Sequence, residues 1–243
     1  MKPSSQNNDD QPIAYDSHSV LNPISPFLLL IAGAAALIEI VLMLAENDMI
    51  GGPNAHNWRT LLIQSFGFYD PIFEQFRETG FSLFFTQPQF ALTFIAYPFV
   101  SYNLPGTLVG VVIFLAVGRA VSIRFSIWAA LVIFAVGIIS GALAYGFVSS
   151  SGLRLLGMFQ PCCALIGAYS WTEYRYRQIS GAPIWPAFRI LFFLAILNMV
   201  QYLFFQPTDF WVAELAAFLA GFGLSYLLAP GAARRIVARL RGN

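Results

Sequence analysis

Six long apolar runs constrain the fold of this chain more than any other feature of its sequence. A helix needs about 20 mostly apolar residues to cross the ~30 Å hydrocarbon layer of a bilayer. Of the 243 residues, 58% are hydrophobic and 10% are charged, which is too much apolar surface for a soluble domain of this size to bury. The runs are continuous rather than alternating, so they predict helices and not the strands of a membrane barrel. The predicted spans are residues 26–44, 100–117, 125–145, 161–171 with its flanks, 188–205 and 211–228.

The basic residues predict how these spans are oriented. Ten of the 13 Lys and Arg residues lie in the N-terminal tail, the second-to-third connection, the fourth-to-fifth connection and the C-terminal tail, which share one side of six spans. Because basic residues concentrate in cytoplasmic segments, we expect both termini in the cytoplasm. The basic residues sit at membrane edges without the aromatic interleaving of a nucleic-acid groove. We therefore expect a lipid bilayer around the chain and no nucleic-acid partner.

A single membrane domain between two tails is predicted. Residues 1–25 are polar and are expected to form a disordered cytoplasmic tail. Residues 26–230 are expected to form the membrane domain, including an interfacial loop over residues 45–97, and residues 231–243 a basic cytoplasmic tail. No signal-peptide pattern precedes the first span, so this span is expected to direct insertion itself. We expect an integral protein of a bacterial inner membrane.

The placement of cysteine and histidine argues against metal or haem chemistry. Cys162 and Cys163 are adjacent in the fourth span, cannot form an ordinary disulfide with each other and lack metal-ligand spacing. His18 and His56 lie outside every predicted span, so a pair of axial haem ligands inside the membrane is excluded. We expect no cofactor and no metal.

The long connection after the first span has an amphipathic pattern. Between positions 56 and 89, aromatic and aliphatic residues recur with rough helical spacing among charged residues. This pattern is typical of short helices lying in the headgroup layer. Trp58 is expected at the interface, and the side chain of Arg59 is expected to reach toward lipid phosphate. A generic interfacial loop is the plainer alternative.

Small residues predict where helices pack closely. In lipid, such residues let two helix backbones approach each other. They are Gly137, Ser140, Gly141 and Ala144 in the third span, and Gly221, Gly223 and Ser225 in the sixth. Pro161 falls in the first turn expected for the fourth helix, where its missing N–H does no harm.

Four short motifs follow one another along the chain. They are Trp58-Arg59 at the start of the long loop, Tyr97-Pro98-Phe99 before the second span, Gly157-Met158-Phe159-Gln160 before the fourth, and Ala213-Glu214 with small residues in the sixth. In this order, on six spans, they resemble the rhomboid family of intramembrane serine proteases. The resemblance covers about residues 26–230. It implies an all-α polytopic membrane protein, a six-transmembrane-helix bundle with a half-embedded amphipathic first loop.

The same resemblance indicates that proteolytic chemistry has been lost. Rhomboids place a nucleophilic serine where this chain has Phe159, a histidine base where it has Glu214, and His and Asn donors where it has Gly106 and Gly110. Acyl transfer needs a nucleophile, a base and oxyanion donors. We therefore expect no catalytic residue. The alternative is an active serine-type endopeptidase of this family with a displaced site, such as Cys163 with Glu214, although a buried apolar thiol is inert.

A catalytically degenerate rhomboid, or pseudoprotease, is expected to bind transmembrane segments of other membrane proteins. In the family, the side of the bundle between the second and fifth helices admits such a segment. The residues expected to take part in binding are Trp58, Arg59, Gln160, Glu214, Phe192 and Phe204.

Two carboxylates at membrane depth, Glu39 and Glu214, each have two interpretations. An ionisable group at this depth suggests a functional site. Glu214 also lies near a helix N-terminus, where the helix dipole favours an acid, and Glu39 could snorkel or stay protonated against a neighbouring helix. A transporter or channel would need a polar path. The candidates to line one are too few, namely Glu39, Glu214, Gln160, Asn198 and Gln201.

Overall fold

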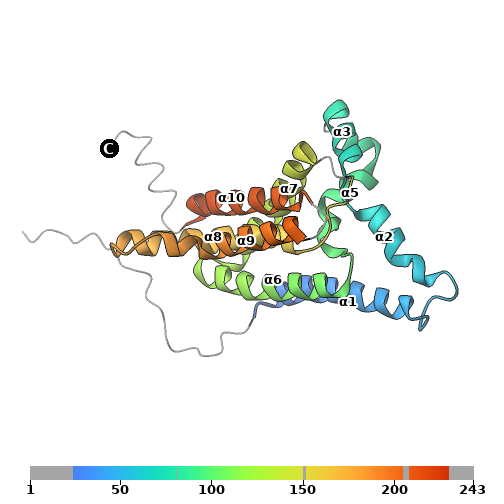
Figure 1. Cartoon of the computed structure of the whole chain (residues 1–243), viewed down its shortest axis with the longest axis horizontal. Coiled ribbons are helices and arrows are strands. Elements are labelled where there is room, and N and C mark those ends of the chain that lie inside the picture. The colour runs from blue at the N-terminus through green and yellow to red at the C-terminus, as the bar shows by residue number, and fades with distance from the viewer. Residues whose placement is uncertain (1–23, 81, 150–151, 205–207, 230–243) are drawn as a thin grey trace, which may run out of the picture.

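The computed structural model describes residues 24–80, 82–149, 152–204 and 208–229, and within these ranges the regular structure is helical apart from one isolated β-bridge. The six long helices are α1 (Pro26–Glu46), α6 (Leu104–Arg124), α7 (Ile127–Val148), α8 (Phe159–Ile179), α9 (Arg189–Phe204) and α10 (Phe210–Leu228). They form one bundle, with the short helices of the first loop gathered at one end (Figure 1). The all-α class is confirmed. The tail 231–243 and residues 1–23 of the other tail lie outside the described residues.

Four helices within the described residues are long and apolar enough to cross a membrane, namely α1, α6, α7 and α10. α8 occupies the predicted fourth span, but its C-terminal part is polar, with the sequence Thr-Glu-Tyr-Arg-Tyr-Arg-Gln. α9 occupies the fifth and has 16 residues, which at a rise of 1.5 Å per residue give about 24 Å. These two helices therefore lie where spans were predicted without matching the bilayer as fully as the other four.

The second long helix begins four residues later than the apolar run suggested. Val100 lies before the helix in extended backbone, and α6 starts at Leu104. The Asn103 side chain accepts a hydrogen bond from the backbone N–H of Gly106 at 2.9 Å, and Pro105 lies in the first turn. An Asn N-cap followed by proline fixes the start of a helix more strongly than apolar composition does.

The connection between α1 and α6 folds into short helices. They are α2 (Trp58–Phe66), α3 (Asp70–Thr79), α4 (Ser82–Thr86) and α5 (Pro88–Ala96), with 3₁₀ turns at Ala55–Asn57 and Tyr97–Phe99. A β-bridge between the fully buried Phe68 and Leu155 ties this loop to the segment before α8, with N···O distances of 3.2 and 2.7 Å. Arg154 adds hydrogen bonds to the carbonyl oxygens of Gln64 and Gly67 at 3.1 and 3.3 Å. The start of α8 is therefore held by the first loop.

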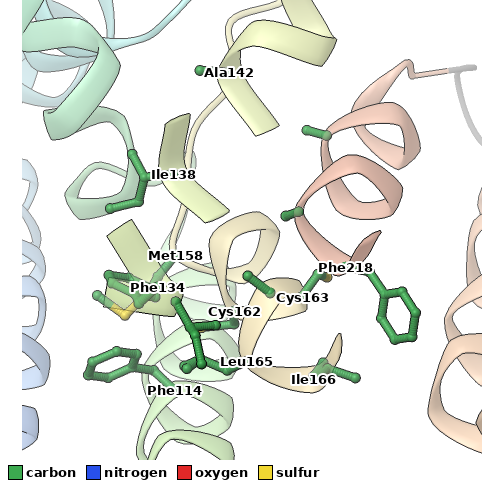
Figure 2. Close-up of a cluster of buried hydrophobic side chains, with 14 of the residues drawn as sticks. Phe114, Phe134, Ile138, Ala142, Met158, Cys162, Cys163, Leu165, Ile166 and Phe218 are labelled. Carbon is green, nitrogen blue, oxygen red and sulfur yellow. The ribbon is translucent and has the colours of Figure 1, made fainter. Parts of the chain in front are cut away.

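α8 is the central helix of the bundle. Residues 160–168 are all buried, and α6, α7 and α10 pack around them. Figure 2 shows residues of this stretch between aromatic side chains of the surrounding helices, Phe114 of α6, Phe134 of α7 and Phe218 of α10. The apolar first half of α8 therefore forms the core against which the other helices are positioned.

Glycines allow α8 and α10 to cross at close range. A Cβ added to Gly221 would lie 2.0 Å from the carbonyl oxygen of Ala164, and one added to Gly167 would lie 2.1 Å from that of Phe218. Gly221 is thus at a helix contact, as its spacing predicted. Gly223 is not, because nothing lies within 4 Å of a Cβ added there.

Candidate functional site

The position expected to lack a nucleophile lies at the start of α8. Phe159 is the first residue of this helix, and its partly buried ring packs against the central core. Gly110 of α6 lies beside it, since a Cβ added to Gly110 would be 3.1 Å from Met158 Cβ and 3.5 Å from the backbone nitrogen of Phe159. The contact between α6 and α8 therefore brings together two of the positions singled out in the sequence.

A small polar group lies at the same end of α8. Gln160 is 7% exposed, and its Oε1 has no hydrogen-bond partner within the described part of the chain. Gln160 Oε1 and Ser101 Oγ each lie 3.6 Å from the Cβ that a side chain at Gly157 would add, and Gly157 has a positive φ of 96°. A Cβ added to Gly106 would be 3.9 Å from the same Ser101 oxygen. Leaving a buried acceptor unpaired is costly, which makes Gln160 a candidate for binding a donor.

Glu214 points toward α9. The amide Nδ2 of Asn198 donates to Glu214 Oε2 at 2.7 Å and to the carbonyl oxygen of Leu194 at 3.1 Å. Asn198 and Glu214 line a cavity of about 320 Å³ between α9 and α10, whose remaining lining residues are apolar. We call this cavity the α9–α10 groove. The pairing of Asn198 with Glu214 was not predicted, because residues on different helices give no spacing signal.

The alternative nucleophile Cys163 does not lie in a catalytic arrangement. Cys163 is fully buried, and its thiol donates to the carbonyl oxygen of Phe159 in its own helix at 3.6 Å. Cys162 makes a similar contact of 3.8 Å with the carbonyl oxygen of Gly110. A nucleophile needs a base within hydrogen-bond reach, and in the described residues neither thiol donates to Glu214.

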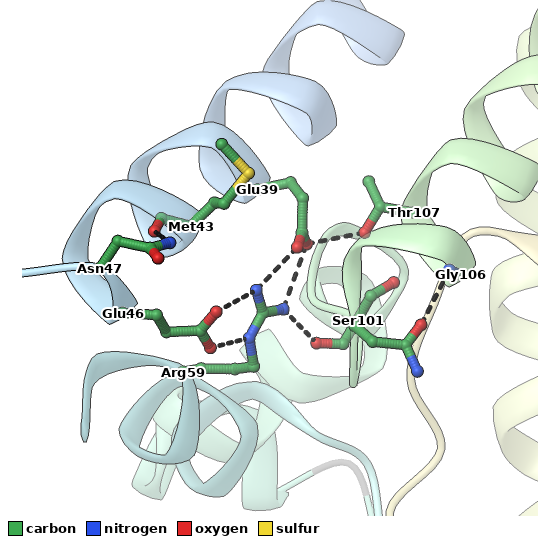
Figure 3. A network of polar contacts seen from close by, with 9 residues as sticks. Glu39, Met43, Glu46, Asn47, Arg59, Ser101, Gly106 and Thr107 are labelled. Carbon is green, nitrogen blue, oxygen red and sulfur yellow. Dashed lines mark hydrogen bonds and ion pairs between the residues drawn. The ribbon is translucent and has the colours of Figure 1, made fainter. Parts of the chain in front are cut away.

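Arg59 points into the protein, and the expectation that it reaches toward lipid phosphate is wrong. Its Nη2 and Nη1 donate to the two carboxylate oxygens of Glu39 of α1 at 2.7 and 3.2 Å (Figure 3). It also pairs with Glu46 through Nε and donates from Nη1 to the carbonyl oxygen of Ser101 at 3.1 Å. Thr107 Oγ1 of α6 donates to Glu39 Oε2 at 2.8 Å. We call these five residues the Arg59 cluster.

The carboxylates of the Arg59 cluster stabilise the charged form of the Arg59 guanidinium. Burial lowers the pKa of Arg59, but hydrogen bonds with Glu39 and Glu46 and the negative charge of both residues raise it by more, so the pKa lies above its ordinary value. The cluster joins α1, α2 and the start of α6, and Glu39 neither snorkels nor lacks a partner. Sequence reasoning missed Glu46 and Thr107. Their signal was weak, because Glu46 lies just past the predicted span and Thr107 is one hydroxyl in an apolar run.

The remaining candidate residues lie apart from one another. Trp58 is partly buried at the start of α2, and its ring covers Gly51, where an added Cβ would be 2.6 Å from Trp58 Cζ2. Phe192 of α9 is 57% exposed, and the side chain of Phe204 lies outside the described part of the structure. The structure thus separates the candidate residues into the Arg59 cluster with Trp58, the polar group near Gln160, and the α9–α10 groove with Glu214.

A comparison with known families identifies the bundle. The model of the Rhomboid domain matches residues 88–231, which is more than half of the chain. The chain belongs to the rhomboid family. With its apolar helices, this rhomboid is an integral membrane protein. The match includes Gly106, Gly110, Phe159 and Glu214 but begins after α1 and α2, so the Arg59 cluster connects the matched domain to the preceding helices.

A short local match links this rhomboid to a different protein. A stretch of 69 residues is 41% identical to the riboflavin transporter rft-2 of Caenorhabditis elegans. The match covers 27% of this chain and 14% of the transporter. So small a share of the transporter does not carry its activity over to this rhomboid. Across the described residues, no three His, Cys, Asp or Glu side chains are grouped so as to hold a metal ion.

Proposed function

We propose that this rhomboid is a pseudoprotease, which lacks peptidase activity and binds transmembrane segments of other membrane proteins. The observation that carries the proposal is the residue at the family's nucleophile position, Phe159, whose ring is packed against the core. Glu214, at the family's base position, is held by Asn198 instead of facing a nucleophile. Loss of a single oxyanion donor reduces the rate of acyl transfer by about 10²–10³, and here the nucleophile, base and donors are all replaced.

The open flank of α9 supports the binding part of this proposal. Six described residues of α9 expose large apolar side chains, namely Phe192, Phe193, Ile196, Met199, Val200 and Leu203. Residues 160–168 of α8, by contrast, are all buried. In the family, the fifth helix borders the side through which substrates enter, and α9 is the fifth long helix here. An exposed apolar helix next to a rigid core suits contact with another helix.

The first loop has a supporting role in this proposal. Arg59 uses its hydrogen bonds on Glu39, Glu46 and Ser101, so it holds the loop against the bundle and shapes the binding surface instead of contacting the client directly. Trp58 begins the helix that carries Arg59. Gln160 lies apart from it, in the polar group at the start of α8, and its side-chain oxygen has no hydrogen-bond partner among the described residues.

The topology we propose has six membrane spans, with α8 and α9 as the fourth and fifth, in a bacterial inner membrane. Ten of the 13 basic residues would then lie on the cytoplasmic side together with both termini. A reporter that is active only outside the cytoplasm tests this when it is fused after Asn243. We expect no activity from that fusion and activity from a reporter inserted in the first loop near Gly52, and the opposite pattern would overturn the orientation.

Absence of peptidase activity is tested with purified protein in liposomes. We expect no cleavage of a transmembrane substrate that an active rhomboid cleaves in parallel, and no labelling by a serine-directed fluorophosphonate. Turnover that is abolished by Cys163→Ala would contradict the proposal and establish the displaced site. We also expect Phe159→Ser with Glu214→His to remain inactive, because Gly106 and Gly110 still provide no side-chain donors.

Binding of membrane proteins is tested by photo-crosslinking in the native membrane. A crosslinking residue at Phe192 of α9 is expected to capture defined membrane proteins. The control position is Ile139 of α7, which has a comparable exposure of 49% against 57% for Phe192. If both positions capture only lipid or the same random mixture, the binding proposal fails.

A further inference from the structure

The α9–α10 groove combines an apolar lining with one carboxylate. Leu191, Leu194 and Phe218 contribute to its wall, and Asn198 and Glu214 are its polar residues. Three further lining residues are open to the surroundings, with exposed fractions of 64% for Met199, 48% for Trp211 and 39% for Leu215. The groove is therefore accessible from outside the helix pair, and Glu214 is part of its lining.

The Glu214 carboxylate has unused capacity to accept hydrogen bonds. Among the described residues, Asn198 is its one hydrogen-bond donor, and the ion pairs found there involve Glu39, Glu46 and Glu173 instead. An ionised carboxylate has about four acceptor positions. A charge at membrane depth is costly unless it is paired. A cation bound in the groove would therefore stabilise the ionised form of Glu214.

An apolar stripe along α9 includes Met199 of the groove and continues beyond the groove. The exposed residues Phe192, Ile196, Met199 and Leu203 follow one another at intervals of four, three and four residues, so they share one face of the helix. At 1.5 Å per residue the stripe is about 16 Å long. A small cation or an amine-bearing lipid headgroup would pair with the Glu214 carboxylate but would leave the apolar stripe of α9 uncovered. A helix lying alongside α9 would cover both.

We propose that the α9–α10 groove binds a transmembrane helix of another membrane protein that carries a lysine or arginine at the depth of Glu214. This inference rests on the proposed function and specifies the chemistry of the partner. The basic group pairs with the Glu214 carboxylate, which Asn198 orients, and the aliphatic stem lies against Leu194 and Phe218. Charge-assisted hydrogen bonds are stronger than neutral ones, and more so away from water. The groove therefore selects a helix with a basic residue over a purely apolar helix.

The test uses the full-length protein with a photo-crosslinking residue at Met199, co-expressed with a single-span probe helix of leucine and alanine. One probe series places a lysine at successive depths, and the reference probe has leucine at those positions. We expect the capture yield to peak at one lysine depth and to exceed that of the reference probe by about tenfold. Glu214→Gln should remove this excess. A crosslinker at Ile139 of α7 should show no dependence on lysine depth.

Charge reversal gives the stronger form of the test. In the Glu214→Lys variant, the capture yield of the lysine probe should fall, and that of a probe with glutamate at the same depth should rise. Equal capture of lysine and leucine probes, or a lysine excess that Glu214→Gln leaves unchanged, would overturn the inference. Capture of an amine-bearing phospholipid at Met199 together with equal capture of both probes would assign the groove to a lipid headgroup and also overturn it. Native proteins captured at Phe192 regardless of Glu214→Gln would uphold the proposed function while the charge pairing fails.

Discussion

Glu39 and Glu214 are both acidic residues within the helical bundle, but they are surrounded very differently. Glu39 is 2% exposed and accepts hydrogen bonds from Arg59 and Thr107 at both carboxylate oxygens. Glu214 is partly buried beside a cavity and, among the described residues, accepts one hydrogen bond from the neutral amide of Asn198. The first carboxylate is matched by a full positive charge, and the second is not.

This difference distinguishes a structural role from a binding role. The Arg59 cluster crosslinks α1, α2 and the segment before α6, and its acceptors are filled from within the chain. Glu214 lines the α9–α10 groove and accepts one hydrogen bond among the described residues, so its carboxylate keeps acceptor capacity. Burial alone does not separate the two roles, because Glu39 and Glu214 are both at least partly buried. The number of hydrogen-bond and ion-pair partners of each carboxylate does separate them.

The largest effect is expected from Arg59→Ala. The change leaves the Glu39 carboxylate buried without its cation, and breaking one partner of a buried ion pair costs about 3–5 kcal/mol. We expect a lower free energy of unfolding, measured by denaturant titration in mixed micelles, and faster proteolysis of the first loop. Arg77→Ala is the matched control, because Arg77 is exposed on the neighbouring helix α3.

The double variant Arg59→Ala with Glu39→Ala sharpens this result. It removes both charges, so it should recover part of the stability lost in Arg59→Ala alone. If Arg59→Ala and Arg77→Ala destabilise the protein equally, the Arg59 cluster contributes no more to stability than an exposed arginine does. Glu39 would then have no structural role that distinguishes it from Glu214.

The second-largest effect tests whether α10, the helix that carries Glu214, is held in a fixed position against α8. Gly221→Ala places a Cβ 2.0 Å from the carbonyl oxygen of Ala164, so α10 must move away from α8 at a cost of about 1–3 kcal/mol. Gly223→Ala is the control two residues away, since its Cβ meets nothing within 4 Å. Unfolding in mixed micelles should separate the two variants. Equal stability would mean that α10 shifts freely, and then the geometry of the α9–α10 groove is not fixed.

The sequence predicted the long helices because their signal is local. Continuous apolar runs place α1, α7 and α10 within a few residues of their observed bounds. The start of α6 was misplaced because Val100 continues the apolar run although Asn103 and Pro105 begin the helix. Among the small residues, periodicity alone could not separate Gly221, which touches α8, from Gly223, which does not.

The sites were harder to predict because they depend on contacts between distant segments. Arg59 and Glu39 are 20 residues apart, and Thr107 is 68 residues from Glu39. The motif Trp58-Arg59 drew attention to the correct arginine, but composition favoured lipid phosphate as its partner. The sequence offers Asn198 only as a candidate to line a polar path, whereas its observed partner is Glu214 on the next helix. Only the packing of helices decides which of these polar groups meet.

A smaller effect is expected from Thr107→Val. The valine preserves the shape of the side chain and removes the hydroxyl that donates to Glu39 at 2.8 Å. Arg59 still pairs with Glu39, so we expect a loss of about 1 kcal/mol, in the range of single hydrogen bonds within membrane proteins. Thr107→Ser is the control, since it keeps the hydroxyl. A loss as large as that of Arg59→Ala would place the main support of Glu39 on α6 instead of α2.

The smallest effect on stability is expected from Glu214→Gln. The glutamine carbonyl still accepts the hydrogen bond from Asn198 Nδ2, which is 2.7 Å from the carboxylate oxygen in the native chain. No internal cation loses its partner among the described residues, so the free energy of unfolding should change by less than about 0.5 kcal/mol. Glu39→Gln is the matched change at the other carboxylate and should cost about 1.5–3 kcal/mol, because Arg59 then loses a charged acceptor. Similar losses from the two substitutions in the same unfolding assay would show that Glu214 also has a strong internal partner, and the groove would then have no free carboxylate to offer a ligand.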